Sequence, residues 1–454
     1  MEQLQKMRSF FNSGITQTYE YRKLQLQKLK DAIVKYEEEI YAALYKDLRK
    51  NKEECYITEN GFVLTEISNT LKKLANWMKA ERVSTNLLNL PSKSYIMKEP
   101  LGVVLIISPW NYPFNLLMTP LVGAIAAGNC VVLKPSELAP ATEAVMKKII
   151  ESTFDSQYIF YAEGNGATIV PELMHNFIFD HVFYTGSTAV GKIIYELAAK
   201  NLVPVTLELG GKSPCIVEAD ADIKVAAKRI AMPKFNNAGQ MCVAPDYVLA
   251  HASVKDALVT EIKKAIVQFF GTNVQDSIAY GRIINEKQFD RLEKYLQDGT
   301  LLVGGKTDKK DLYIEPTLLE ITNVEVGIMQ AEIFGPILPI ITFEEMDEAV
   351  QIISKHKNPL AFYLFTASSA TEKKWLQKIP AGGGCINNVT MHLSNHNLPF
   401  GGRGASGSGS YHGKFSFDTF SHKKAILKTP TWLDPAIKYP PFTGKLGLFK
   451  KIFK

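Results

Sequence analysis

The stretch CVVLKPSELAPATEAVMKKII, from Cys130 to Ile150, joins a short apolar run to a polar turn and then to a helical pattern. A continuous run of apolar, β-branched residues is typical of a strand buried on both faces of a parallel sheet. The prolines and the glutamate that follow favour the first turn of a helix. The stretch therefore predicts a strand followed directly by a helix, the repeating unit of an α/β protein.

The same pairing recurs along the chain. GVVLII (102–107) is one such apolar run, and HVFYTG (181–186) leads into the helical pattern STAVGKIIYELAAK (187–200). A second series comprises VTLELGGKSPCIVE (205–218), DIKVAAKRIAMPKF (222–235), YVLAH (247–251), ILPIITF (337–343) and AFYLFTAS (361–368). The alternation predicts an α/β fold with two Rossmann-like parallel-sheet domains in tandem.

Two segments outside this alternation have patterns of their own. Apolar residues at three- and four-residue steps predict amphipathic helices near the N-terminus: Leu26, Leu29, Ile33, Tyr36, Ile40, Leu44 and Leu48. The mixed segment VSTNLLNLPSKSYIMKEP (83–100) suits a hairpin that leaves the first domain.

Composition excludes several functional classes. The chain is 46% apolar and 22% charged, and its net charge of +6 is mild and scattered, which argues against nucleic-acid binding. It has no apolar run of about 18 residues and no signal-peptide pattern, so a cytosolic location is expected. The five cysteines are odd in number and widely spaced, so neither a disulfide framework nor a bound metal is expected.

Cys242 lies in FNNAGQMCVAPDYV (235–248), between small residues and the start of a strand. A thiol in such a loop is either an inert buried group or a nucleophile, and its own segment leaves both interpretations open. Glu208 ends a strand beside a glycine pair, where ligands of α/β sheets bind, and a carboxyl group in an apolar cleft could activate water. Asn111, in SPWNYP, offers amide N–H groups that could stabilise an oxyanion.

Other strand-to-helix junctions are candidates for cofactor binding. GSTAVG (186–191) follows a strand and opens a helix, so its backbone N–H groups could face a phosphate. LKPSE supplies Lys134 and Glu137, and EIFGP supplies Glu332 and Phe334 before an apolar run. Each motif alone also fits a purely structural role.

The order of these motifs resembles the aldehyde dehydrogenase superfamily from about Glu99 to His422. The chain contains, in sequence, PWN, KPSE, FYTGS, LELGGKSP, NAGQxC, EIFGP and LPFGG. The segments APDYV, YHGKFSFDTFSHKK and KYPPF are similar to the class 3 branch of bacterial type, the fatty and aromatic aldehyde dehydrogenases.

The resemblance implies a role for each motif. Cys242 would attack the aldehyde, Asn111 and the Cys242 backbone N–H would hold the oxyanion, and Glu208 would activate the water that hydrolyses the thioester. The cofactor would be NAD, with NADP also possible. The implied cofactor-binding residues are Trp110, Lys134, Glu137, Gly186, Ser187, Gly191, Glu332 and Phe334.

Two further predictions concern the class of substrate and the residues that differ from the family pattern. Tyr112, Leu116, Met118 and Met241 are apolar or aromatic residues near the motifs, which favours a hydrophobic medium- or long-chain or aromatic aldehyde, although core packing would explain them equally. Met241, Ala331 and Arg403 depart from the residues usual in the family, and the first and last are expected to alter the substrate tunnel.

The resemblance divides the chain into four parts. Residues 1–82 and 100–207 would bind NAD(P), residues 208–396 would carry the nucleophile, residues 83–99 and 397–430 would form an oligomerisation arm, and residues 431–454 would form a tail. A homodimer is implied by the resemblance alone.

The C-terminal tail has the pattern of a short amphipathic helix. Leu448, Phe449, Ile452 and Phe453 lie on one helical face, and Lys450, Lys451 and Lys454 lie on the other. This pattern fits binding to a membrane surface, a gate at the substrate tunnel or simple packing.

Three other functions compete with this interpretation. A cysteine hydrolase would leave the cofactor motifs unexplained and has no recognisable Cys/His motif. A CoA-acylating dehydrogenase typically lacks a glutamate in the position of Glu208. A binding protein that had lost catalysis would not be expected to keep Cys242, Glu208 and Asn111 together.

Overall fold

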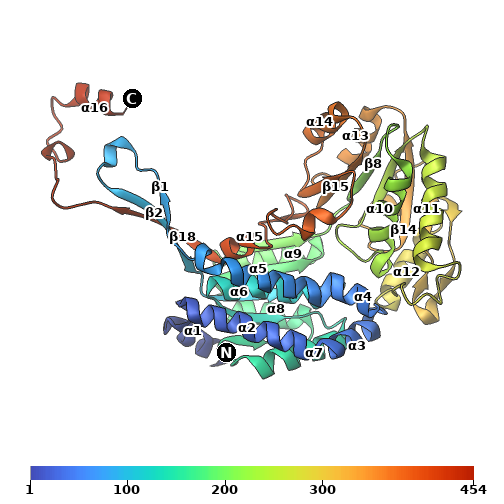
Figure 1. Ribbon diagram of the computed structural model, residues 1–454, viewed down its shortest axis with the longest axis horizontal. Coiled ribbons are helices and arrows are strands. Elements are labelled where there is room, and N and C mark those ends of the chain that lie inside the picture. The colour runs from blue at the N-terminus through green and yellow to red at the C-terminus, as the bar shows by residue number, and fades with distance from the viewer. Residues whose placement is uncertain (1, 454) are drawn as a thin grey trace.

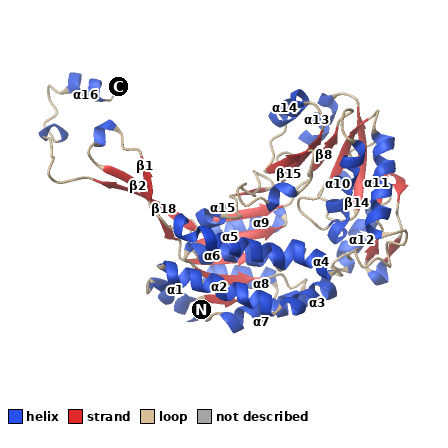
Figure 2. Cartoon of the chain, in the orientation of Figure 1, coloured by secondary structure: helices blue, strands red, loops and turns tan. Residues whose placement is uncertain are grey.

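The structure is a computed structural model that describes residues 2–453 of the 454-residue chain. Figure 1 shows two α/β domains side by side, with a narrow arm that extends from the first and carries the C-terminal tail. Helices and strands alternate through both domains (Figure 2). The predicted α/β fold with two parallel-sheet domains is confirmed.

The sheet of the first domain has the strand order β17-β7-β6-β3-β4-β5. Its strands are β3 (Val103–Ile107), β4 (Cys130–Lys134), β5 (Ile159–Tyr161), β6 (His181–Gly186), β7 (Val205–Leu209) and β17 (Gly407–Ser408). The helices between them are α6 (Asn115–Ala127), α7 (Pro140–Thr153), α8 (Gly166–Asn176) and α9 (Thr188–Ala199). Strands β3 to β7 pair in parallel, and every residue of β3 and β4 is buried, as expected for a sheet covered on both faces.

N-terminal helices cover one face of this domain (Figure 1). They are α1 (Glu2–Asn12), α2 (Tyr19–Lys35), α3 (Glu37–Leu48), α4 (Lys52–Cys55), the π-helix η2 (Tyr56–Asn60) and α5 (Gly61–Trp77). Helix α2 lies against α5, α6 and α7 and buries Leu26, Leu29 and Ile33. The side chain of Asp47 accepts hydrogen bonds from the backbone N–H groups of Ala141 and Thr142, which stabilises the start of α7.

The second domain has the strand order β10-β13-β14-β9-β8-β15-β16. Its strands are β8 (Pro214–Val217), β9 (Tyr247–His251), β10 (Thr300–Val303), β13 (Thr317–Glu320), β14 (Ile337–Phe343), β15 (Ala361–Phe365) and β16 (Gly383–Ile386), with the small pair β11 (Thr307–Asp308) and β12 (Tyr313–Ile314) beside them. Its helices are α10 (Ile223–Phe235), α11 (Lys255–Phe270), α12 (Glu286–Tyr295), α13 (Met346–Ser354) and α14 (Ser369–Lys378). Among the described residues of this seven-stranded sheet, β10 pairs antiparallel with β13, and the other neighbouring strands pair in parallel.

The arm is a three-stranded antiparallel sheet of β1 (Glu81–Val83), β2 (Lys93–Pro100) and β18 (Ser421–Lys428). Residues 397–420, which we expected in the arm, lie instead on the first domain. There β17 pairs with β7, and α15 (Lys414–Thr419) lies against α6. Burial of the aromatic rings of Phe400, Tyr411 and Phe417 holds this segment on the domain, so only β18 reaches the arm.

The C-terminal tail extends beyond the arm and ends in α16 (Leu446–Ile452). Leu448 and Phe453 are exposed, whereas the ring of Phe449 packs near that of Phe442 at 5.8 Å. Lys454 and the side chain of Ile452 lie outside the described residues. Within residues 2–453 no helix is both long and apolar enough to cross a bilayer.

Candidate active site

The structure brings Asn111, Glu208 and Cys242 together from three separate segments. Asn111 follows β3, Glu208 lies near the end of β7, and Cys242 follows α10 and the short helix η4 (Asn236–Gly239). The Asn111 side-chain Nδ2 donates a hydrogen bond of 3.0 Å to the backbone carbonyl of Gln240. Strand ends and the loops after them are where α/β sheets bind ligands, so their convergence marks a candidate active site.

Two cavities meet at these residues. One of about 340 Å³ and one of about 220 Å³ share Leu116, Thr185, Glu208, Leu209 and Cys242 in their walls. The larger cavity is lined mostly by apolar side chains, and the smaller one by turn residues and Glu332. Cys242 therefore stands where two ligands would meet.

The loop that carries Cys242 has a special backbone conformation. Asn237 and Ala238 both have a φ of 49°, which residues with a Cβ rarely adopt. Buried hydrogen bonds hold this conformation: Glu54 accepts from the Asn237 backbone N–H at 3.0 Å. The Gln240 side chain donates to the carbonyls of Asn237 and Arg282. The nucleophile candidate is thus held in a fixed position.

Burial controls the electrostatics of the site. It raises the pKa of Cys242 to about 12, and the nearby carboxyl groups of Glu332 and Glu208 add to this effect. The backbone N–H groups of Cys242 and Val243 lie against the sulfur and partly offset it. Burial also raises the pKa of Glu208 well above its ordinary value and that of Glu332 to about 8. Raised carboxyl pKa values of this kind suit proton transfer near neutral pH.

Comparisons with known proteins identify the family. The model of the Aldehyde dehydrogenase family matches residues 4–426. The 4,4'-diaponeurosporen-aldehyde dehydrogenase of Staphylococcus aureus is 50% identical over 98% of this chain and 97% of its own. Aldehyde dehydrogenase family 3 member H1 of Arabidopsis thaliana is 44% identical over 98% of this chain and 93% of its own. The substrate-bound structure of Staphylococcus aureus AldH has a TM-score of 0.97 at 49% identity and covers 100% of this chain and 99% of that chain.

The chain belongs to the aldehyde dehydrogenase family. The resemblance found in its motifs is confirmed, and this aldehyde dehydrogenase is an oxidoreductase that uses NAD(P).

The smaller cavity of the dehydrogenase fits the cofactor. It is lined by Trp110, Gly186, Ser187, Glu332 and Phe334, all expected as cofactor-binding residues. Among the residues described, the Thr185 hydroxyl and the Glu332 Oε1 are buried without a hydrogen-bond partner, as expected of groups that await a hydroxyl-bearing ligand. The rings of Trp110 and Phe334, which both line this cavity, pack edge to face with their centres 5.3 Å apart.

The other expected cofactor residues lie outside its wall. Gly191 is buried in α9, where a Cβ would meet the side chain of Leu209 at 2.6 Å, so glycine allows the helix to pack on β7. Lys134 is buried at the end of β4 and donates to the Pro135 carbonyl and to Glu137. Glu137 in turn accepts from the Gly166 backbone N–H at 3.0 Å. Burial raises the pKa of Glu137, but hydrogen bonds from its own backbone N–H and that of Gly166, together with the charge of Lys134, outweigh this and lower the pKa.

The expected substrate residues divide into two groups. Tyr112, Leu116 and Met241 line the larger cavity. Met118 is fully buried in α6 and lines neither cavity, so its expected place in the substrate pocket is wrong. The physical reason is helical geometry, because residues two positions apart lie on opposite sides of a helix, so Met118 faces the domain core while Leu116 faces the cavity.

The departures from the family pattern lie in different environments. Arg403 is exposed and lines neither cavity, which removes its expected effect on the tunnel. Ala331 contributes its carbonyl to a hydrogen bond from the buried Lys212 Nζ at 3.0 Å. Of these three residues, only Met241 lies in the wall of the larger cavity.

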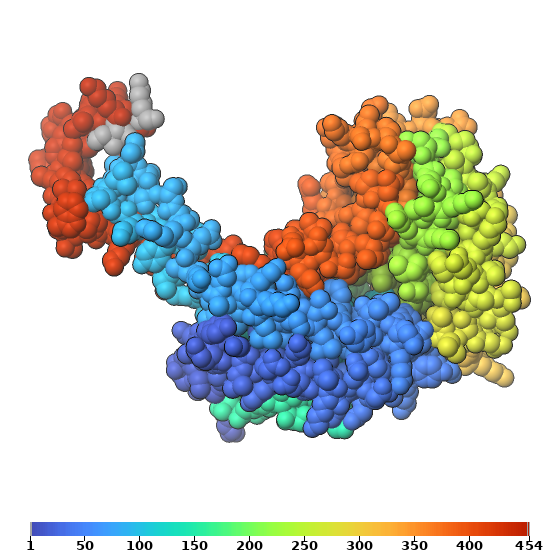
Figure 3. All heavy atoms as spheres, viewed as in Figure 1, coloured from blue at the N-terminus to red at the C-terminus, as the bar shows by residue number. Residues whose placement is uncertain are grey.

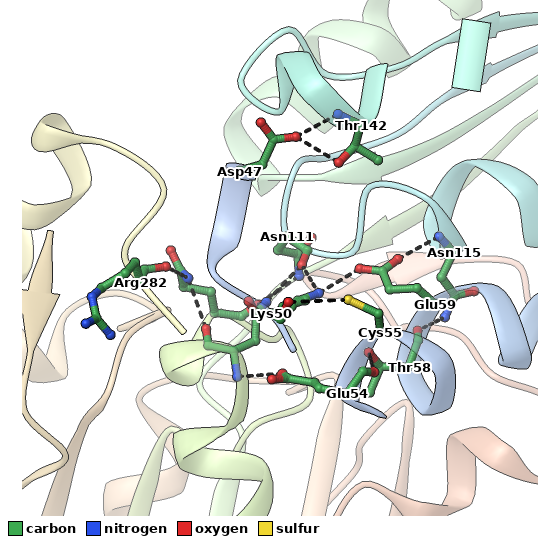
Figure 4. A network of polar contacts seen from close by, with 12 residues as sticks. Asp47, Lys50, Glu54, Cys55, Thr58, Glu59, Asn111, Asn115, Thr142 and Arg282 are labelled. Atoms are coloured by element: carbon green, nitrogen blue, oxygen red, sulfur yellow. Dashed lines mark hydrogen bonds and ion pairs between the residues drawn. The ribbon is translucent and has the colours of Figure 1, made fainter. Parts of the chain in front are cut away.

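Several residues of the site were not anticipated from the sequence. Apolar residues from distant segments complete the larger cavity: Ile57, Phe62, Met232, Met391 and Leu393. Lys50 and Glu59 form a fully buried ion pair beside Asn111. No motif marks these positions, because each is an ordinary residue of a helical or irregular segment until the fold assembles it. Figure 4 shows the polar contacts around Lys50, Glu59 and Asn111.

Proposed function

We propose that this dehydrogenase oxidises hydrophobic aldehydes to carboxylic acids through a covalent bond to Cys242. One observation carries the proposal: Cys242 and Glu208 lie where an apolar cavity of about 340 Å³ meets the cavity that fits the cofactor. A nucleophile at this junction reaches a carbonyl carbon from one side while the other side holds the hydride acceptor.

The residues of the chain divide the chemistry between them. The Cys242 sulfur, as thiolate, adds to the aldehyde carbon, and the Asn111 amide and the Cys242 backbone N–H hold the resulting oxyanion. NAD(P)⁺, when bound among Trp110, Ser187 and Glu332, would supply the acceptor for the hydride that leaves this carbon, and loss of that hydride leaves a thioester on Cys242. The Glu208 carboxylate then takes a proton from water, whose oxygen attacks the thioester carbon. The carbon–sulfur bond breaks, the carboxylic acid leaves, and Cys242 returns to the thiolate while Glu208 releases its proton to solvent.

The lining of the larger cavity supports the choice of substrate. Phe62, Met232, Met241, Met391 and Leu393 surround it, so an alkyl chain or an aromatic ring would bury its surface against apolar atoms. Burial of each CH₂ contributes about 0.8 kcal/mol, so affinity should rise with chain length until the cavity is full.

The test is NADH formation with saturated aldehydes of increasing chain length and with benzaldehyde, for wild type and Cys242→Ala. We expect kcat/KM to rise with chain length and turnover to vanish in the variant. Activity that survives in Cys242→Ala would remove this residue as the nucleophile. Equal kcat/KM for short and long aldehydes would remove the hydrophobic substrate class.

We infer further that the dehydrogenase is a homodimer. Strand β18 is an edge strand of the arm sheet, and β16 is an edge strand of the sheet in the second domain, so each could pair with a strand of a second copy. Helix α9 exposes Val190, Ile193 and Tyr195, which a second copy would cover. The arm projects away from the body and leaves a wide hollow beside it (Figure 3). Light scattering should give twice the 50.7 kDa of one chain, and the monomer mass would refute the dimer.

We infer also that the enzyme, which we expect in the cytoplasm, makes weak contact with a membrane surface through its tail. Exposed apolar side chains lie on it beside lysines: Trp432, Leu446, Leu448, Phe453, Lys450 and Lys451. Flotation with anionic vesicles should carry the full chain upward but not a chain that lacks residues 445–454. Equal flotation of both would exclude this role.

A further inference from the structure

A buried ion pair lies beside the active site but outside both cavities. The Lys50 Nζ is 2.6 Å from the Glu59 Oε1, and neither side chain has any exposed surface. Lys50 follows α3, and Glu59 belongs to the π-helix η2. A π-helical turn is rare and is frequent at functional sites, and here it carries Glu59, whose side chain meets Lys50. Figure 4 shows the pair among the segments that it joins.

Both partners hold the loop that carries Asn111. The Lys50 Nζ donates to the Asn111 carbonyl oxygen at 2.9 Å and lies 3.8 Å from the centre of the Tyr112 ring. The Glu59 Oε2 accepts from the Asn115 backbone N–H at 2.9 Å. The ion pair therefore fixes the loop at Asn111 and again at the start of α6.

The Cys242 loop is fixed to the same point. The Asn237 Nδ2 donates to the Asn111 carbonyl oxygen at 2.8 Å, beside the bond from Lys50. The Asn111 side chain returns a bond to the Gln240 carbonyl. Since the Asn111 amide has two N–H groups, one remains for a substrate oxyanion, and its direction depends on where the backbone is held.

Stability alone gives little reason for such a pair. Removing two charges from water costs several kcal/mol per ion, and an apolar pair of similar volume is often as stable. The need to hold a catalytic group in place does give a reason for the pair, because a displacement of such a group by about 1 Å lowers the rate about 10²-fold.

We propose that Lys50 and Glu59 are positioning residues that set the direction of the Asn111 side-chain amide toward the oxyanion. The proposal rests on the proposed function, in which Asn111 holds that oxyanion. It gives the N-terminal helices a part in catalysis, although they contribute no group that touches the substrate.

A double-mutant cycle tests this coupling. The variants are the charge-neutral Lys50→Met/Glu59→Gln, Asn111→Ala, and their combination. We expect Lys50→Met/Glu59→Gln to lower kcat/KM for aldehyde about 10- to 100-fold, while KM for NAD and the rate of Cys242 alkylation by iodoacetamide stay within about twofold. When the same two substitutions are added to Asn111→Ala, kcat/KM should fall by less than about threefold relative to Asn111→Ala, since no amide remains to be positioned.

The outcomes separate the two proposals. Independent, multiplicative losses in the combined variant, or no loss in Lys50→Met/Glu59→Gln, would overturn the positioning role. Full activity of Asn111→Ala would instead refute the oxyanion role of Asn111 in the proposed function. The control is Lys255→Met/Glu320→Gln, which removes an ion pair of 2.7 Å in the second domain and should leave kcat/KM unchanged.

A conservative variant keeps the test usable if the double change prevents folding. Glu59→Gln retains an oxygen for the Asn115 backbone N–H but loses the charge-assisted bond to Lys50. We expect it to lower kcat/KM about 3- to 10-fold, again without further effect in the Asn111→Ala background. A multiplicative effect there would overturn the proposal as well.

Discussion

The side-chain Nδ2 of Asn111 donates a hydrogen bond of 3.0 Å to the backbone carbonyl of Gln240, across 129 positions of sequence. This bond joins the turn after β3 in the first domain to the loop that carries Cys242 in the second. The proposed oxyanion donor and the proposed nucleophile are thus joined by a direct contact between the domains, two residues from the Cys242 sulfur.

The side chain of Gln240 is expected to stabilise that contact. It makes three hydrogen bonds: it donates to the carbonyls of Asn237 and Arg282 and accepts from the Ile284 backbone N–H. Gln240→Ala leaves these groups unpaired and should lower the free energy of unfolding by about 2–4 kcal/mol. Urea titration followed by fluorescence measures the change, with the exposed Gln297→Ala as a control. Equal stability of both variants would contradict the expectation.

Glu208→Gln should stop hydrolysis without stopping the first half of the reaction. The amide cannot accept a proton from water, so the thioester should accumulate on Cys242. We expect a burst of about one NADH per active site, followed by a steady rate about 10²–10⁴-fold below that of wild type. Stopped-flow absorbance at 340 nm measures both phases. A steady rate equal to that of wild type would exclude Glu208 as the base.

Alkylation of Cys242 should increase steadily with pH. The thiolate is the reactive form, and with a pKa of about 12 its population rises about tenfold per unit across pH 7–10. Iodoacetamide inactivation in the absence of cofactor measures this slope. A plateau below pH 9 would show that the pKa is not raised.

Glu332→Gln should change this profile only at higher pH. The pKa of Glu332 is about 8, so below pH 8 its carboxyl group is mostly neutral and the substitution changes little. Above pH 8 the wild-type carboxylate repels the Cys242 thiolate, and its removal should speed alkylation about two- to tenfold. Equal acceleration at pH 7 and pH 9 would contradict a charge effect of Glu332.

Glu137 should determine the choice between NAD and NADP. Its carboxylate would accept a hydrogen bond from a free ribose 2′-hydroxyl and repel a 2′-phosphate, whereas Lys134 would attract the phosphate. We expect wild type to use both cofactors and to prefer NAD. Glu137→Gln should raise the ratio of kcat/KM for NADP to that for NAD about tenfold. A wild-type preference for NADP would overturn the expectation.

Local patterns were enough to predict much of the fold and part of the site. The apolar run 130–134 and the helix after it form one repeat of the α/β alternation, and both are found as β4 and α7. Asn111 and Glu208 stand in short motifs at strand ends and Cys242 in a short motif of a loop, so each could be selected as a candidate, and the order of the motifs along the chain implied a role for each. Met118 was misplaced because an apolar residue beside a motif has the same pattern whether it faces the core or a pocket.

The sequence by itself determined the alternation of strands and helices and the candidates for the reactive groups, because hydrophobic periodicity and motif chemistry act over a few neighbouring residues. The tertiary structure alone decided which distant residues support those groups. Lys50 and Glu59 are charged residues of a helical region, where a solvent-exposed position is the usual expectation. Their burial beside Asn111 follows from the packing of the N-terminal helices against the first domain, and no local pattern encodes that contact.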